Sequence, residues 1–153
     1  MGELRIQNMK VGDKFVSPSR VLTATHIETF CNISGMLHPL FLSDAYVKND
    51  SYCQSMGIKT TVAPGQLLLG IMLGNLLGAG LISDVIVQLG QNDIKFVAPA
   101  YPNDQLRTEV EVTDTRVTKS GDRVVVHYKW QLKNQDDVVV VKGENDCMFK
   151  KEN

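Results

Sequence analysis

The sequence VAPGQLLLGIMLGNLLGAGLI, residues 62–82, is the part of the chain around which the rest is organised. Its run from Leu67 to Ile82 is the most apolar in the chain, but glycines and Asn75 interrupt it. It therefore falls short of the about 18 uninterrupted apolar residues of a membrane-spanning helix. Pro64 and Gly65 begin a helix here, because proline fits the first turn, where an N–H has no partner. The stretch predicts a buried core helix whose glycines allow a sheet to pack closely against it.

From Val85 onward the apolar residues recur at every second position, as in strands that have one buried and one solvated face. Polar turn sequences separate the later runs. The expected strands are Val85 to Leu89, Asp93 to Val97, Arg107 to Val112, Val124 to Leu132 and Val138 to Phe149. The sequence thus predicts an α+β fold, in which an antiparallel sheet of about five strands wraps around the long apolar helix.

The first half of the chain predicts helices joined by irregular segments. Thr25 followed by Glu28 fits a capping box, so a helix is expected to begin there, and Gly35 ends it. Ser43 and Asp44 then cap a second, short helix.

Composition excludes several classes of partner. The chain has 153 residues, 43% of them hydrophobic and 22% charged, with a formal net charge of −1. A chain of this length buries roughly 70% of its unfolded surface, which favours a single domain over residues 1–153. Balanced charge without a basic block argues against nucleic acid or an anionic membrane as a partner.

The cysteines and the N-terminus bear on metal binding and location. Cys31, Cys53 and Cys147 form no C-x-x-C pair, so we expect neither a disulfide framework nor a metal site. The segment Met1 to Val11 has no apolar run of the signal-peptide type. The expected location is therefore the cytoplasm.

Several segments also resemble one known family. In chain order they are Phe30-Cys-Asn-Ile-Ser-Gly35, His38-Pro39-Leu40, Val62-Ala-Pro-Gly65, Gly90-Gln91, Phe96-Val-Ala-Pro-Ala-Tyr-Pro-Asn-Asp104 and Asn134-Gln135. Together they resemble the MaoC-like dehydratases, also called (R)-specific enoyl-CoA hydratases. The resemblance implies the hotdog fold and a role in lipid or acyl-CoA metabolism. It also implies an acyl thioester, of coenzyme A or an acyl carrier, as substrate or ligand, and no other cofactor.

The family's catalytic motif is altered in this chain. In the motif D-x-N-P-x-H, the Asp and the His hold and deprotonate the water that adds to an enoyl thioester. When the motif is aligned on Pro39, Met36 stands at the Asp position and Phe41 at the His position. Neither a thioether nor a phenyl ring can take a proton from water, so the family mechanism cannot run with its usual residues.

Other groups offer replacements, each with a plainer alternative. His38 stands at the Asn position of the motif and can titrate near neutral pH, so it is the catalytic candidate. Its alternative role is to cap the local turn. Ser43 and Asp44 lie just downstream, but their context is that of a helix N-cap. His127, on the polar face of a strand, and His26 are most simply surface histidines.

The resemblance also implies a binding site that does not need those side chains. In the family, a backbone N–H at the start of the central helix points at the thioester oxygen, and the matching residue is Gly65. A helix N-terminus carries free N–H groups and partial positive charge, which polarise a carbonyl. The residues expected to make the pocket apolar are Met36, Leu40, Phe41, Met56 and Leu68. Lys59 is the candidate contact for a coenzyme A phosphate. The alternatives are an ordinary helix start, a filled core and a solvated lysine.

Three functions fit these residues. The first is a hydratase or dehydratase, a lyase, that uses His38 with Gly65 as the electrophile. The second is a non-catalytic binding or partner subunit whose Asp and His come from another hotdog chain. The third is a hotdog thioesterase, which needs a carboxylate near the central helix, yet residues 64–80 contain no Asp or Glu. In each case we expect a homodimer or a larger hotdog oligomer, because a bare edge strand is otherwise a liability.

Overall fold

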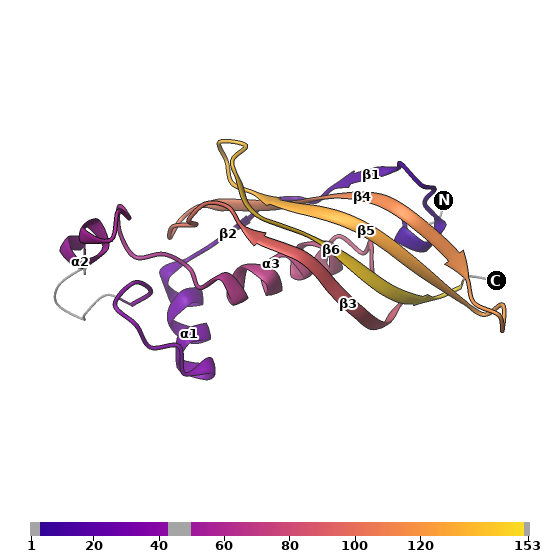
Figure 1. Ribbon diagram of the computed structural model, residues 1–153, viewed down its shortest axis with the longest axis horizontal. Coiled ribbons are helices and arrows are strands. Elements are labelled where there is room, and N and C mark those ends of the chain that lie inside the picture. The colour runs from indigo at the N-terminus through magenta and orange to yellow at the C-terminus, as the bar shows by residue number, and fades with distance from the viewer. Residues whose placement is uncertain (1–3, 43–49, 152–153) are drawn as a thin grey trace.

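The computed structural model describes residues 4–42 and 50–151. The helices precede Val85, and the long strands follow it (Figure 1). The elements are η1 (Ile6–Asn8), β1 (Lys14–Val16), β2 (Arg20–Val21), α1 (Ala24–Ser34), α2 (Asp50–Ser55), α3 (Gly65–Gly78), β3 (Val85–Phe96), β4 (Gln105–Val117), β5 (Arg123–Lys133) and β6 (Val139–Lys150).

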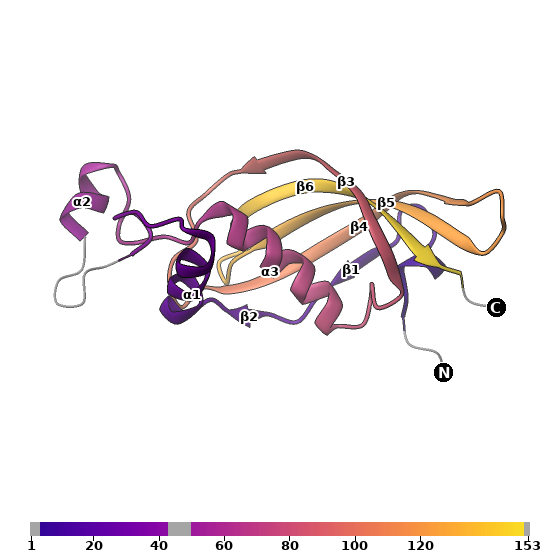
Figure 2. The same cartoon turned by 90° about the horizontal axis from the view of Figure 1, so that it is seen from below.

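The strands form one antiparallel sheet that curves around α3. Their order is β1-β4-β5-β6-β3, and β2 also pairs with β4. Figure 2 shows α3 lying along the concave face of this sheet. The predicted hotdog architecture is therefore confirmed, and the described residues form six strands in place of about five. Alternation gives no sign of β1 and β2, because strands of three and two residues are too short to show it.

Burial along the central strands follows the predicted alternation. In β4 every second side chain from Leu106 to Val112 is buried, and in β5 the same holds from Val126 to Leu132.

The edge strand β3 differs from its prediction. The pattern indicates two strands separated after Gly90, whereas β3 is continuous and shifts its register against β6. Asp93, with a φ of 53°, lies within one of these shifts.

The central helix is confirmed as a buried apolar helix, with different bounds. The apolar run predicts helix as far as Ile82, whereas α3 ends at Gly78, and Gly80 has a φ of 81°. That left-handed backbone suits glycine and does not continue a helix. Leu81 and Ile82 remain buried in the turn that follows. At the other end Pro64 is the N-cap, one position before the first turn.

Two buried polar side chains hold α3 against β4. Asn75 Nδ2 donates to the carbonyl of Leu106 (3.2 Å) and to Thr108 Oγ1 (3.3 Å). The Thr108 hydroxyl donates in turn to the carbonyl of Met72 (3.0 Å). Because hydrogen bonds are directional, these contacts fix how far the helix lies along the strand. They thereby position Gly65 at the helix start.

The capping box predicted from Thr25 and Glu28 is wrong. Thr23 is the N-cap of α1: its Oγ1 accepts the N–H of His26, and His26 Nδ1 accepts the N–H of Thr23, both at 3.1 Å. A histidine ring nitrogen here takes the role that Glu or Gln usually takes. Gly35, with a φ of 79°, ends the helix as predicted.

The segment between α1 and α3 is only partly described. The short helix predicted from Ser43 and Asp44 lies outside the described residues. The structure places a six-residue helix, α2, just after it, and the sequence DSYCQS shows no apolar period that would predict it. Cys53 is the buried residue of α2.

Candidate functional site

A hollow of about 530 Å³ lies at the beginning of α3. In Figure 2 the first turn of α3, α1 and the end of β3 meet at this end of the molecule. Apart from the amide of Gln66, the described lining consists of apolar side chains and glycine. The residues that define it are Gly65, Gln66 and Leu68 of α3, residues 96–100 at and after the end of β3, and Met36 and Ile58 from the loops.

The first turn of α3 presents its N–H groups without a side-chain cap. Pro64, the N-cap, makes no side-chain hydrogen bond to them, and the first N–H groups of a helix have no partner within it. Gly65 has no side chain to cover its own N–H. The helix start therefore gives the hollow a positive end that can polarise a carbonyl oxygen.

The ring of Phe96 lies against Gly65. A Cβ on Gly65 would lie 2.8 Å from Cδ1 and 2.9 Å from Cζ of this ring, closer than non-bonded carbon atoms pack. Phe96 is the last residue of β3, and 53% of its surface is exposed. The ring thus forms the part of the wall beside the helix start.

Three of the predicted binding residues come together in this hollow. Met36, Gly65 and Leu68 line it, whereas Leu40 and Phe41 lie outside its lining. Phe41 is partly buried and packs against the hydrophobic core. Around the helix start, the predicted binding residues therefore surround an open space. At Phe41 the alternative applies, because this side chain packs as part of the core.

Met56 and Lys59 also lie outside the lining. Met56 is exposed. The ammonium of Lys59 lies 5.1 Å from the centroid of the Tyr101 ring, a cation–π distance. Because Lys59 follows Ile58, which lines the hollow, it stands beside the rim.

His38, the catalytic candidate, is exposed and caps a turn. Its Nδ1 accepts the N–H of Leu40 at 3.2 Å. Its ring centroid lies 5.9 Å from that of Phe41 and 6.0 Å from that of Tyr52. His38 does not line the hollow. Within residues 4–42 and 50–151, the lining contains no ionisable side chain. The arrangement matches the capping alternative.

The other two histidines also have structural roles. His26 belongs to the capping box of α1. His127 is half-buried on the face of the sheet away from α3, because its neighbour Tyr128 points into the core. Its Nδ1 pairs with a carboxylate oxygen of Asp146, and the second oxygen accepts from Asn92 Nδ2 at 3.3 Å. His127 is thus a paired sheet residue, not a simple surface histidine.

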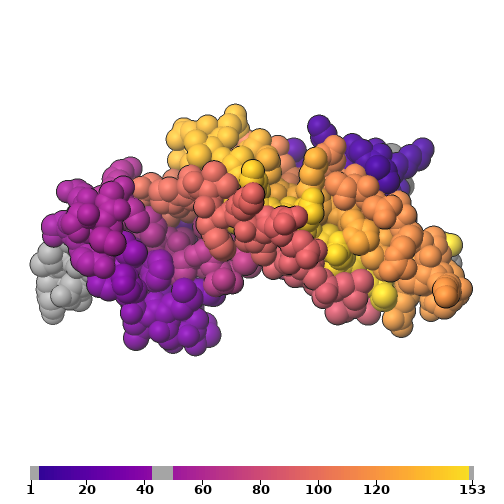
Figure 3. Space-filling model, in the orientation of Figure 1, coloured from indigo at the N-terminus to yellow at the C-terminus, as the bar shows by residue number. Residues whose placement is uncertain are grey.

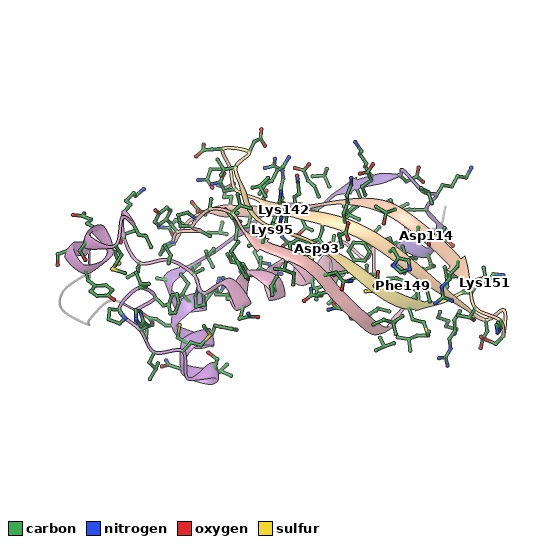
Figure 4. The ribbon with its side chains drawn as sticks, viewed as in Figure 1. Asp93, Lys95, Asp114, Lys142, Phe149 and Lys151 are labelled. Atoms are coloured by element: carbon green, nitrogen blue, oxygen red, sulfur yellow. The ribbon has the colours of Figure 1, made fainter. Side chains whose placement is uncertain are left out.

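The outer face of the sheet, away from α3, carries a second hollow of about 590 Å³. Two of its carboxylates are ion-paired: Glu111 lies 3.0 Å from Nζ of Lys129, which also lines the hollow, and Glu109 lies 3.2 Å from Nζ of Lys133. The hydrogen bond from Lys129 holds the pKa of Glu111 below its usual value. Figure 4 labels three further charged side chains of this hollow, Asp93 and Lys95 on β3 and Lys142 on β6. The pattern is that of a solvated, ion-paired sheet face.

Two of the cysteines, Cys31 and Cys147, are not activated as nucleophiles. All three are buried and free. Burial raises the pKa of the thiols of Cys31 and Cys147 above the ordinary value. The thiolate, which is the reactive form, is therefore disfavoured at both positions.

Reasoning from the sequence misses Phe96 and Gln66 as site residues. Phe96 stands in a segment that resembles the family, but its contact with Gly65 depends on how β3 approaches α3. Gln66 is obscured by the apolar run that follows it. One signal points to the contact at Gly65: glycine is a poor helix former, so its place in the first turn indicates that space is limited there.

Comparison with protein families identifies the fold family of the chain. The family model described as MaoC like domain matches residues 7–134. The chain belongs to the MaoC-like domain family. This confirms the resemblance read from the sequence. The search of curated proteins gave no match.

Solved structures similar to this MaoC-like domain share its hotdog fold. The MaoC-like dehydratase from Rhodospirillum rubrum is 21% identical, with a TM-score of 0.79 over 98% of this chain and 99% of that one. The (R)-hydratase from A. caviae involved in PHA biosynthesis is 24% identical, with a TM-score of 0.72 over 95% and 99%. A chain of the HadBC (3R-hydroxyacyl-ACP dehydratase) complex from Mycobacterium tuberculosis is 17% identical, with a TM-score of 0.71 over 93% and 98%.

Two further features of the MaoC-like domain concern membranes and metals. Among the described residues, no helix is both long and apolar enough to cross a membrane. Within the same part of the chain, no group of three His, Cys, Asp or Glu side chains is arranged to hold a metal ion.

Proposed function

We propose that this MaoC-like domain binds an acyl thioester, of coenzyme A or an acyl carrier, with the carbonyl at the start of α3. The observation that carries the proposal is an apolar hollow at an uncapped helix N-terminus. The N–H of Gly65 donates to the thioester oxygen, and the acyl chain contacts Met36 and Leu68. The setting that such a ligand implies is lipid or acyl-CoA metabolism in the cytoplasm.

Hydration of an enoyl thioester, or its reverse, is the reaction to which the family points. It needs a polarised carbonyl and a group that takes a proton from water. Gly65 supports the first requirement. The second finds no support in the described lining, where Met36 stands at the position of the family's Asp. Among the described side chains, the candidate for that role is His38, which would have to leave its turn and reach the hollow.

Binding is tested by calorimetry with butyryl-CoA and octanoyl-CoA, and with free coenzyme A as the reference. The acyl chain should add at least tenfold to the affinity, since each buried CH₂ contributes about 0.8 kcal/mol. Met36→Ala should weaken acyl binding, whereas Leu37→Ala, an exposed apolar neighbour outside the lining, should leave it unchanged. Equal affinities for butyryl-CoA, octanoyl-CoA and free coenzyme A would contradict the proposal.

Catalysis is tested by following the loss of enoyl absorbance when crotonyl-CoA is hydrated. Activity that disappears in His38→Ala would support a lyase that uses His38 as its base. Activity that persists in this variant would exclude that role. If thioesters bind but no enoyl-CoA reacts, the protein is not a hydratase by itself.

A second function, as a binding or partner subunit of a hotdog oligomer, is favoured by the same lining, whose described side chains include no proton-transfer group. A hetero-complex is also named for one similar structure, HadBC. The edge strand β3 offers a surface for such pairing, because its side chains Ile86, Val87 and Leu89 are exposed. Figure 3 shows β3 uncovered across the visible face.

Assembly is tested by light scattering after size-exclusion chromatography. We expect a dimer or larger species, which Leu89→Lys on β3 should weaken. A monomer at micromolar concentration would contradict a homo-oligomer. Co-purification with a homologue that carries the Asp and His of the motif would favour the partner-subunit function over a self-sufficient enzyme.

A further inference from the structure

We propose that Phe96 determines which acyl groups the hollow accepts, by excluding thioesters that carry a substituent on the carbon next to the carbonyl. The inference rests on the proposed function and narrows its substrate class to acyl groups that are unbranched at that carbon.

The contact between Phe96 and Gly65 is the first step. The ring occupies the space where any other residue at position 65 would carry its Cβ, at 2.8 Å from Cδ1 and 2.9 Å from Cζ. Other glycines of α3 are not constrained in this way: a Cβ on Gly70, Gly74 or Gly78 would meet nothing within 4 Å. The glycine at the helix start is therefore required by the space that the ring takes.

The position of the ring relative to a bound thioester is the second step. A carbonyl oxygen that accepts from the N–H of Gly65 lies about 2.9 Å from that nitrogen. The carbonyl carbon, and then the next carbon of the acyl chain, follow at bonding distance. A ring in contact with the same glycine therefore flanks this part of the acyl chain.

The shape of the surrounding wall is the third step. The residues that follow Phe96 in the lining, Val97, Ala98, Pro99 and Ala100, all have smaller side chains than phenylalanine. Phe96 is thus the bulky side chain of this wall. An unbranched chain passes beside the ring, whereas a methyl branch next to the carbonyl needs the space of the ring itself. Because 53% of Phe96 is exposed, the ring can move aside, so the discrimination is graded.

The size of the effect follows from pocket selectivity in general. One extra methyl group in an apolar pocket changes discrimination by about 10- to 200-fold. We expect the wild-type protein to bind butyryl-CoA at least about tenfold more tightly than its isomer isobutyryl-CoA, which has the same number of carbons. The comparison of isomers keeps the apolar content of the two ligands nearly equal.

The closing experiment measures both affinities for the full chain, for three single variants and for one double variant. Phe96→Ala should reduce the preference for butyryl-CoA to less than about threefold, because the branch now has space. Val117→Ala, at an exposed residue of β4 outside the hollow, should keep the wild-type preference. Gly65→Ala keeps its backbone N–H but displaces the ring, so it should lose affinity for butyryl-CoA. Phe96→Ala should restore that affinity in the double variant.

Thermal melting without ligand provides the second readout. Gly65→Ala should lower the melting temperature in the wild-type background and change it less in the Phe96→Ala background. If the wild type binds thioesters and the preference is the same in Phe96→Ala, the specificity role of Phe96 is wrong and the proposed function stands. If the wild type binds no thioester, the proposed function fails, and the specificity role fails with it.

Discussion

Replacing Asn145 by alanine is expected to destabilise the fold through a buried hydrogen-bond chain. Trp130 Nε1 donates to Asn145 Oδ1 at 2.9 Å, and Asn145 Nδ2 donates to the Tyr128 hydroxyl at 3.0 Å. All three side chains are at most 2% exposed, on the adjacent strands β5 and β6. Water therefore cannot replace the amide when it is removed.

The magnitude follows from these contacts. Each of the two hydrogen bonds contributes about 1 kcal/mol, and a buried N–H left without an acceptor costs about 1–3 kcal/mol. The tyrosine is less affected, because its hydroxyl still lies 3.8 Å from Cys147 Sγ. We expect a loss of about 2–4 kcal/mol, out of a typical total of about 5–15 kcal/mol. For a chain of this size that lowers the melting temperature by about 5–15 °C.

The assay is urea unfolding followed by circular dichroism. Asn32→Ala, an exposed asparagine on α1, is the control and should change stability by no more than about 0.5 kcal/mol. Trp130→Phe should cost about 1 kcal/mol less in the Asn145→Ala background than alone, because the N–H that it removes is already unpaired. A cost below about 1 kcal/mol for Asn145→Ala would refute the reasoning.

Three further predictions test packing, capping and ionisation. Gly143→Ala should lose about 1–3 kcal/mol in urea unfolding, since its Cβ would lie 2.8 Å from Cζ2 of Trp130. Gly74→Ala, with nothing within 4 Å, should not destabilise, and equal costs would refute the packing argument. Thr23→Ala should lose about 1 kcal/mol in thermal melting, because it removes the acceptor for the first turn of α1; an unchanged midpoint would contradict the cap. Burial raises the pKa of Tyr128 far above its ordinary value near 10, so the unfolded chain ionises first. The contribution of Tyr128 to stability should therefore be complete below pH 10 and fall above it by up to about 1.4 kcal/mol per pH unit. Tyr128→Phe should reduce that slope. An identical slope in the variant would count against a contribution from Tyr128 ionisation.

The central strands and helix can be predicted from the sequence because each has one dominant environment. The residues of β4 and β5 alternate between core and solvent, and the pattern records that alternation directly. The edge strand β3 cannot be predicted as well. Its irregularities arise from pairing with β6, and exposed side chains on both faces leave no alternating pattern to follow. The cap of α1 is missed for a similar reason, since Thr23 and Thr25 both fit a cap and His26 is an unusual partner.

The candidate site can be predicted only where its position is fixed by regular structure. Gly65 and Leu68 lie on α3, and their place in the hollow follows from the helix start. Phe41 and Met56 lie in irregular segments, where hydrophobicity does not distinguish a pocket wall from core or from exposed surface. The structure assigns them to core packing and to solvent respectively.

Binding and proton transfer depend on different parts of this site. The N–H of Gly65 belongs to the backbone, so it is present whatever side chains surround it. Proton transfer depends on side chains, and Met36 and Phe41 supply none that can exchange a proton. An apolar residue at position 36 also avoids the free-energy cost of placing a carboxylate in an apolar wall. An apolar residue at this position is therefore compatible with the proposed binding of an acyl chain. Because binding of the proposed thioester and proton transfer depend on different groups, binding and turnover must be measured separately.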